Sequence, residues 1–220
     1  VGGIGMSALA LVLIKRGYSI SGSDKCTNET TLKLSEAGVK IFEEQKAINI
    51  ESLCKNNRKN LIVVVSTAIP AKNPEIKESE KQGLEIVHRS DILNSLISEQ
   101  PSILIAGSHG KTTTSTIVTT LLALCKKDPT AIVGGIIPFY KSNGHAGEGK
   151  YLVAEVDESD GTLIKFKGDI GLITNLELEH TDHYRDIESL QQKISIFGQK
   201  CKKLIVNYDS HNLKNIIKGK

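Results

Sequence analysis

Short apolar runs rich in β-branched residues alternate along the chain with segments whose apolar residues recur at helical spacing. This alternation constrains the fold most, because repeated βαβ units build a parallel sheet covered by helices. The sequence therefore predicts an α/β fold. The expected strands are 19–22, 39–42, 61–66, 85–88, 102–106, 131–133, 151–156, 170–175 and 203–207, and the expected helices are 5–16, 29–37, 74–82, 91–98, 111–124 and 187–200.

Two glycine-rich turns, near residues 2–5 and 107–110, each open a predicted helix. Two such turns fit two nucleotide-binding domains better than one. A polar segment with a proline, residues 97–103, lies between them, so we expect domains at 1–98 and 99–220. The strand that should precede the first turn is not in the sequence, which begins with Val1. The first domain is therefore expected to lack its first strand, and the chain to be a fragment.

Composition excludes several classes of protein. Lys and Arg exceed Asp and Glu by only three (28 against 25), which does not favour nucleic acid as a partner. No apolar run approaches the roughly 20 residues of a membrane span, so no membrane insertion is expected. Four scattered cysteines form no pair typical of a disulfide or zinc framework, which favours a reducing cytoplasm. The oligomeric state is not predicted.

The first turn contains Gly3-x-Gly5-x-x-Ala8, the pattern of a dinucleotide-binding turn. Glycines there let backbone N–H groups approach a diphosphate at a helix N-terminus. Asp24 follows about 20 residues later, where an acid can accept a hydrogen bond from a ribose hydroxyl. NAD is the commonest ligand of this motif, and the alternative is a glycine turn with a surface aspartate.

Polar side chains also end two later strands of the first domain. In an open parallel sheet, ligands bind at the carboxyl ends of strands. Ser66, Thr67, His88 and Arg89 are therefore candidate contacts to the same ligand. Ser66 and Thr67 could instead cap the helix that follows, and His88 and Arg89 could be solvated surface residues.

The stretch "IAGSHGKTTTSTIV", residues 105–118, places a glycine loop between a strand and a helix. The usual phosphate-binding loop is G-x-x-x-x-G-K-[ST], whereas only two residues separate the glycines here. The lysine would reach the β- and γ-phosphates, and a threonine hydroxyl would serve Mg²⁺. We call residues 107–110 the phosphate loop. The candidate ATP contacts are Gly107, Ser108, His109, Gly110, Lys111, Thr112 and Thr113.

Acidic residues follow two further strands of the second domain. Glu155 lies within the apolar run "YLVAEV", where burying an acid is costly without a partner. Carboxylates beside a phosphate loop suit Mg²⁺. Asp157, Glu158 and Asp160 are either ligand contacts or a solvated loop, and His180 is either a ligand or a structural histidine. Zinc is disfavoured because no cysteine is near "TNLELEHTDHY", which contains Asn175, Glu177, Glu179, His180 and Asp182.

These motifs occur together in one order: "GGIGMSA", "SGSD", "STAIP", "HRSDIL", "GSHGKTTT", "AEVDESD" and "TNLELEHTDHY". In that order and spacing the whole chain resembles the Mur ligase family, in which G-[TS]-H-G-K-T is the usual form of the loop. The resemblance implies a cytoplasmic, ATP- and Mg²⁺-dependent ligase of peptidoglycan precursor synthesis. It would join L-alanine to UDP-N-acetylmuramate through an acyl-phosphate intermediate.

The resemblance also implies roles for residues. Those around the UDP moiety would be Gly3, Gly5, Asp24, Ser66, Thr67, His88 and Arg89. Those that hold Mg²⁺ would be Thr112, Glu155 and His180, and the catalytic residues would be Lys111, Asn175 and His180, with Asn175 near the γ-phosphate. Two residues depart from the family pattern: Ser108 replaces a common threonine, and Glu179 replaces the usual aspartate. The chain is expected to stop partway through the family's central domain.

Other functions remain open from the residues. A sibling ligase would join a whole peptide to UDP-N-acetylmuramate. An NAD-dependent oxidoreductase would explain the first turn but has no use for the phosphate loop. A non-catalytic nucleotide-binding regulator would not need Lys111, Glu155 and His180 together.

Overall fold

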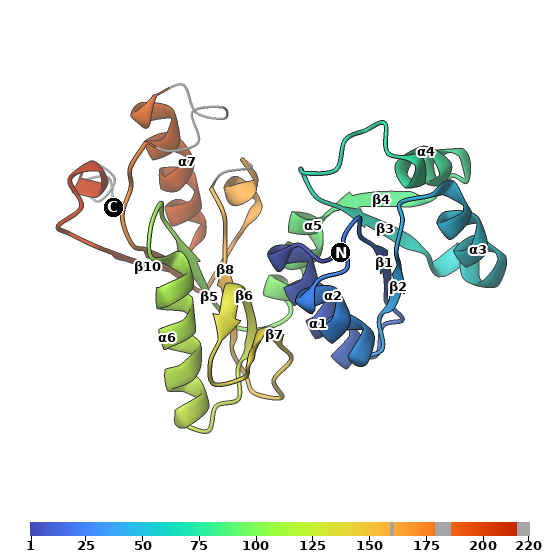
Figure 1. Cartoon of the computed structure of the whole chain (residues 1–220). Helices are drawn as coiled ribbons and strands as arrows, with labels where there is room; N and C mark the ends of the chain where they lie inside the picture. Colours follow the sequence, from blue (N-terminus) through green and yellow to red (C-terminus); the bar gives the residue numbers. More distant parts are fainter. Residues whose placement is uncertain (159–160, 179–185, 215–220) are drawn as a thin grey trace. The chain divides into compact units, whose positions relative to one another are not determined.

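A computed structural model describes residues 1–158, 161–178 and 186–214, and the chain divides into two compact units, Val1–Leu93 and Asn94–Lys220 (Figure 1). Strands and helices alternate in both units, which confirms the predicted α/β class. The described residues include no helix with the length and apolar character that crossing a bilayer would require.

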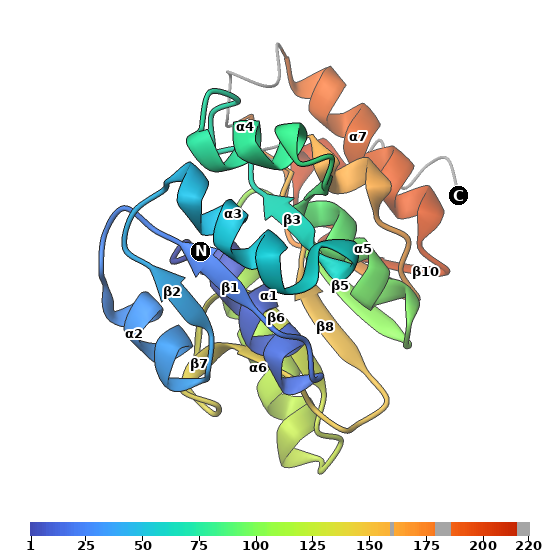
Figure 2. The ribbon, with the colours of Figure 1, turned by 90° about the vertical axis from the view of Figure 1, so that its right-hand side faces the viewer.

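Unit 1 contains two pairs of parallel strands (Figures 1 and 2). Strand β1 (Ser21–Ser23) pairs with β2 (Lys40–Phe42), and β3 (Ile62–Val65) pairs with β4 (Glu85–His88). The helices are α1 (Ile4–Lys15), α2 (Glu29–Glu36), α3 (Ala47–Asn57), α4 (Pro74–Lys81) and α5 (Arg89–Ser98), which continues past Leu93, and a 3₁₀ turn, η1, spans Arg58–Asn60.

The core of unit 1 forms where α1 and α2 meet the first strand pair. Ala10, Leu34 and Val39 are buried together there. Helix α2 begins at a capping box, because the Asn28 side chain accepts from the Thr31 N–H and the Thr31 hydroxyl accepts from the Asn28 N–H, both at 2.9 Å. The cap fixes where α2 starts and so which of its residues face α1.

Unit 2 is built on one six-stranded sheet with the order β10-β9-β5-β8-β6-β7. All neighbours are parallel except β6 and β7. Helix α6 packs against β5, β6 and β8 (Figure 1). The strands are β5 (Ser102–Ala106), β6 (Thr130–Ile137), β7 (Ser142–His145), β8 (Leu152–Glu155), β9 (Ile170–Ile173) and β10 (Lys203–Val206), and the helices are α6 (Lys111–Leu124), α7 (Ile187–Lys200) and the 3₁₀ turns η2 (Thr162–Lys165) and η3 (His211–Leu213).

The register of this sheet brings the candidate site together. Ile105 of β5 lies opposite Glu155 of β8, and Ala106 lies opposite Ile173 of β9. Because carboxyl ends of parallel strands share one edge, the segments that follow β5, β8 and β9 converge there.

The structure contains elements that were not predicted from the sequence. Helix α3 and strand β7 were not predicted, and β6 runs to Ile137 instead of ending at residue 133. Helix α3 has no side-chain cap to signal its start. The capping alternative for Ser66 and Thr67 is wrong, because the next helix is capped by Asn73, whose side chain accepts from the Glu75 N–H at 2.8 Å.

Two hydroxyl groups on α6 are fully buried without a hydrogen-bond partner among the described residues: those of Ser115 and Thr119. A buried polar group without a partner keeps its desolvation penalty. We therefore expect Thr119→Val, which preserves shape, to raise the free energy of unfolding by about 1 kcal/mol. Urea unfolding measures this change in the free energy of unfolding, and Thr116→Val, at a partly exposed position of α6, is the control. A loss of stability at Thr119 would mean that the hydroxyl has a partner.

Candidate active site

The phosphate loop has the backbone expected of an anion site. Gly107 has φ +127° and Gly110 has φ +76°, conformations that a side chain would strain. Gly110 is the N-cap of α6 and has no side chain to cap the helix, and the first turn of α6 carries no acid. The first N–H groups of α6 are therefore available to phosphate oxygens, and the predicted strand–loop–helix arrangement is confirmed.

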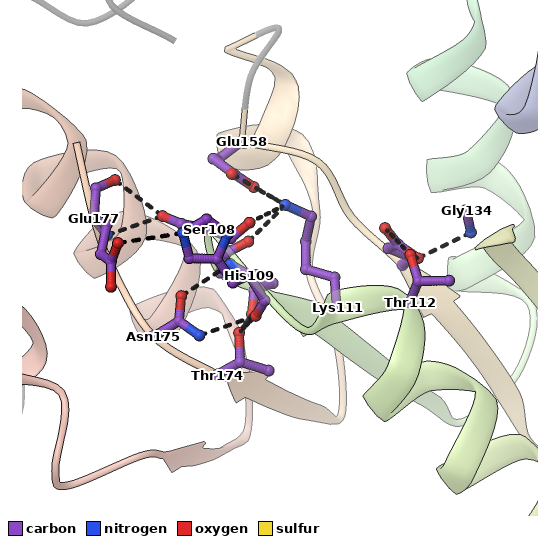
Figure 3. Close-up of polar contacts among 12 residues, drawn as sticks. Ser108, His109, Lys111, Thr112, Gly134, Glu158, Thr174, Asn175 and Glu177 are labelled. Atoms are coloured by element: carbon purple, nitrogen blue, oxygen red, sulfur yellow. Dashed lines mark hydrogen bonds and ion pairs between the residues drawn. The ribbon is translucent and has the colours of Figure 1, made fainter. Parts of the chain in front are cut away.

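Residues 174–177, which follow β9 and are called the strap here, hold the loop in place (Figure 3). The Asn175 side chain accepts from the His109 N–H at 2.9 Å and donates to the His109 carbonyl at 3.0 Å. Thr174 donates its hydroxyl to the same carbonyl at 2.6 Å. The Ser108 hydroxyl donates to the Glu177 carbonyl and accepts from the Glu177 N–H, both at 3.0 Å.

These contacts use two of the backbone donors of the loop. The Ser108 N–H donates to the Asn175 carbonyl at 3.2 Å, so the N–H groups of Ser108 and His109 are both used by the strap. A phosphate must then be met by N–H groups from Gly110 onward. Asn175, predicted to lie near the γ-phosphate, directs its amide at the loop backbone.

Lys111 lies at the start of α6 and forms an ion pair with Glu158 (Figure 3). Its ammonium nitrogen is 2.9 and 3.1 Å from the two carboxylate oxygens and donates to the Gly107 carbonyl at 2.6 Å. Burial raises the pKa of the Glu158 carboxyl, and the bond to Lys111 opposes that rise. The solvated-loop alternative is wrong for Glu158, which is only 1% exposed.

Thr112 and Glu155 form the second contact of the site. The Thr112 hydroxyl donates to a Glu155 carboxylate oxygen at 2.9 Å, and the Gly134 N–H donates to the same oxygen at 2.9 Å. A Cβ on Gly134 would lie 2.7 Å from the Glu155 carboxylate, and one on Gly135 would lie 2.7 Å from the Thr112 methyl group. The two glycines of β6 therefore make room for this pair.

The Thr112–Glu155 pair fits Mg²⁺ by the type of its ligands. A hydroxyl and a carboxylate are hard oxygen donors, and Mg²⁺ takes few protein ligands when phosphates complete its shell. Across residues 1–158, 161–178 and 186–214, no three His, Cys, Asp or Glu side chains gather as a metal site. His180, the third predicted ligand, lies outside the described residues, as do Asp160, Glu179 and Asp182.

In unit 1 the structure brings Gly5 and Arg89 together. Gly3 is the N-cap of α1 and Gly5 lies in its first turn. A Cβ on Gly5 would lie 3.3 Å from a guanidinium nitrogen of Arg89, so a side chain there would crowd the arginine. The guanidinium thus lies at the N-terminal end of α1. A diphosphate there would be attracted by the guanidinium and by the helix N-terminus.

Asp24 holds the backbone around the first turn. Its carboxylate accepts from the Gly2 N–H at 2.7 Å and from the Cys26 N–H at 3.2 Å. Burial alone would raise the pKa of this carboxyl, but the bonds from Cys26 and Gly2 lower it overall. The predicted contact between Asp24 and a ribose stays a prediction.

Thr67 and His88 lie side by side at the carboxyl ends of β3 and β4. The Thr67 hydroxyl is 3.2 Å from His88 Nε2, and His88 Nδ1 is 2.8 Å from the Ser90 hydroxyl. Ser66 directly follows β3 and accepts at its carbonyl from the Ile69 N–H. A separate hollow of about 490 Å³, lined by Lys25, residues 43–46, Pro70 and residues 72–74, contains none of the seven predicted UDP contacts.

The residues of the site that were not predicted from sequence include Thr174, Gly134 and, as a partner of Lys111, Glu158. Thr174 and Gly134 carry no local pattern that marks them. For Glu158 the only signal was its place in a cluster of acids after a strand that was expected to end beside the phosphate loop. An acid there could pair with the lysine of the loop. Each acts through a contact with a residue far along the chain.

Comparison with known families gives two adjoining matches. Residues 1–101 match the Mur ligase family, catalytic domain, and residues 105–220 match the Mur ligase middle domain. The chain is 56% identical over 214 residues to a UDP-N-acetylmuramate–L-alanine ligase of Prochlorococcus marinus, with 97% of this chain and 45% of that protein covered. A Synechococcus protein of the same name is 54% identical over 214 residues, with 97% and 44% covered. The chain thus spans less than half the length of these relatives.

Solved structures agree with these matches. A UDP-N-acetylmuramate–alanine ligase from Thermotoga maritima aligns with a TM-score of 0.87 at 25% identity, covering 98% of this chain and 49% of that one. A UDP-N-acetylmuramate:L-alanyl-γ-D-glutamyl-meso-diaminopimelate ligase from Neisseria meningitides aligns with a TM-score of 0.88 at 18% identity, covering 99% and 72%, and shows the shared fold. With a phosphate loop, a paired lysine and a middle-domain match over more than half its residues, this chain belongs to the Mur ligase family.

Proposed function

We propose that the protein containing this chain is an ATP-dependent amide-forming ligase that joins L-alanine to UDP-N-acetylmuramate in peptidoglycan precursor synthesis. One observation carries the proposal: Lys111 and the Thr112–Glu155 pair flank the N-terminus of α6, whose N-cap, Gly110, has no side chain to cap it. The names of the relatives at 54–56% identity support the choice of substrates. The cytoplasm, where such precursors are made, is the proposed location.

In unit 2 this chain would bind and neutralise phosphates. ATP with Mg²⁺ would supply the phosphoryl group that activates the muramate carboxylate as an acyl phosphate for attack by the amine of L-alanine. Backbone N–H groups of residues 110–113 and the Lys111 ammonium would stabilise charge on the transferred group. Thr112 and Glu155 would hold Mg²⁺, with His180 as the proposed third ligand. Asn175 would act through the loop that it holds, next to the proposed position of the γ-phosphate.

In unit 1 this chain would bind the UDP moiety. Arg89 and the N-terminus of α1 offer positive charge to a diphosphate at Gly3 and Gly5. Thr67 and His88 offer hydrogen bonds at the neighbouring strand ends. We assign residues 1–98 to the UDP-sugar and residues 99–220 to ATP.

A ligation assay tests this function. The complete gene product that contains this chain is incubated with UDP-N-acetylmuramate, ATP, Mg²⁺ and a panel of amino acids and peptides. We expect phosphate release and amide formation to depend on L-alanine. Dependence on a peptide instead would identify the sibling ligase, and no dependence on ATP would contradict the proposal. Stabilisation by NAD but not by ATP would favour the oxidoreductase.

We expect Glu155→Gln to raise the Mg²⁺ concentration needed for half-maximal turnover. The amide preserves volume and can still accept from the Gly134 N–H, but it removes the negative charge that Mg²⁺ needs. Mg²⁺ titration of turnover measures the effect, and the affinity for UDP-N-acetylmuramate serves as the internal control, since its proposed contacts all lie in unit 1. An unchanged titration would make Glu155 a structural acid.

A further inference from the structure

Glu158 is a buried carboxylate to which the proposed function assigns no task. Its side chain is 2% exposed, and that of Lys111, its partner, is 13% exposed. Burying a charge is unfavourable unless it is paired and hydrogen-bonded. Among the described residues, Glu158 supplies the only carboxylate that forms an ion pair with the Lys111 ammonium, and Glu155 is bound to Thr112 and Gly134.

The contacts of the Lys111 ammonium are unequal. A lysine ammonium has three N–H donors. The Gly107 carbonyl is 2.6 Å away and the two Glu158 carboxylate oxygens are 2.9 and 3.1 Å away, whereas the Ser108 carbonyl is 3.4 Å away. The Gly107 carbonyl and the Glu158 carboxylate therefore fix the nitrogen, and the Ser108 carbonyl is its weakest contact.

A nitrogen fixed in this way is suited to receive a phosphate oxygen in place of its weakest contact. A free lysine side chain loses up to about 2 kcal/mol of rotamer entropy when it is ordered. Glu158 and Gly107 order Lys111 by contacts within the protein, since they hold its ammonium at the loop (Figure 3). The carboxylate also keeps the ammonium paired inside the protein.

We propose that Glu158 is a positioning residue that holds the Lys111 ammonium at the phosphate loop, in position to contact the transferred phosphoryl group. The expected effect of Glu158 on turnover rests on the proposed function. The position of the ammonium itself is independent of the reaction. The two can therefore fail separately, and the experiment measures both.

The first measurement is NMR of lysine side chains in the complete, ¹⁵N-labelled gene product without nucleotide. A buried, paired ammonium exchanges its protons slowly, so we expect one resonance that disappears in Lys111→Ala. We expect it to weaken or disappear in Glu158→Gln and to persist in Glu188→Gln, a matched change of an exposed acid on α7. No such resonance in the wild type, or one unaffected by Glu158→Gln, would overturn the proposal.

The second measurement is a double-mutant cycle on turnover. We expect Glu158→Gln to lower kcat on the order of tenfold while the KM for UDP-N-acetylmuramate stays about constant, as for a contact within one coupled pair. In the Lys111→Ala background, Glu158→Gln should cause no further loss, because a residue that acts through Lys111 has nothing left to position. Losses that multiply, or a wild-type kcat in Glu158→Gln, would overturn the proposal.

The variant Glu158→Asp tests whether a loss of kcat in Glu158→Gln comes from the lost charge or from impaired folding. Glu158→Asp keeps the charge but withdraws it by one methylene, so its kcat should lie between those of the wild type and Glu158→Gln. A kcat equal to or below that of Glu158→Gln would show that the charge is not what positions Lys111. If the wild type has the resonance but catalyses no ligation, the proposed function fails and the position of Lys111 stands.

Discussion

Replacement of Lys111 by alanine should lower turnover of the complete gene product by at least about a hundredfold, the usual loss when one preorganised charge stabiliser is removed. The Lys111 ammonium contacts the phosphate loop directly, through its 2.6 Å hydrogen bond to the Gly107 carbonyl. Without it, charge on the transferred phosphoryl group would be met by backbone N–H groups and Mg²⁺ alone. Steady-state kinetics at saturating ATP measure the loss.

The same substitution should also destabilise unit 2. Removing one partner of a buried ion pair leaves the other without compensation and typically costs about 3–5 kcal/mol. Urea unfolding separates this effect from the kinetic one, and Lys127→Ala, a change of an exposed lysine beyond the end of α6, is the control for both. Turnover close to that of the wild type would contradict the assignment of the phosphate loop.

Gly107→Ala should disrupt the phosphate loop. At φ +127° an alanine is strained, and its Cβ would lie 2.2 Å from the Thr174 hydroxyl and 2.9 Å from the Asn175 carbonyl oxygen. The second neighbour is backbone, so the strap would have to move. We expect a loss of about 1–3 kcal/mol from backbone strain, with the steric contact in addition, and weaker ATP binding.

Gly110→Ala is a matched control for this prediction. Gly110 also has a positive φ, at +76°, but a Cβ there would meet nothing within 4 Å. It should therefore show the conformational penalty alone, about 1–2 kcal/mol. Urea unfolding and ATP calorimetry on both variants give the difference that belongs to the strap. Equal effects would mean that the strap does not pack on Gly107 as described.

Local sequence patterns were sufficient to predict the strand, loop and helix that carry the site. The run "SILIA" followed by glycines, a lysine and threonines predicts strand, loop and helix, and β5 and α6 begin and end within a residue of the expected positions. The α/β alternation predicts that the strand ends meet, since parallel strands share a carboxyl edge. These features depend on residues close to one another in sequence.

Long-range contacts were not predictable in the same way. The strap contacts the loop across more than 60 residues, as between Thr174 and His109, and Glu158 pairs with Lys111 across 47. Gly134 and Gly135 resemble the end of a strand in sequence, because glycine weakens strands. In the folded unit they continue β6, because only glycine leaves room there for Glu155 and Thr112.

The hydrogen bonds between the strap and the phosphate loop also decide when the loop becomes ordered. Ser108 and His109 are bound to residues 175 and 177 by hydrogen bonds within the protein, so their conformational entropy is lost during folding. Binding a nucleotide then requires little further ordering of these residues, which favours affinity through preorganisation. A substitution that loosens the strap would move that entropy loss into the binding step, and its effect would appear as a less favourable binding entropy.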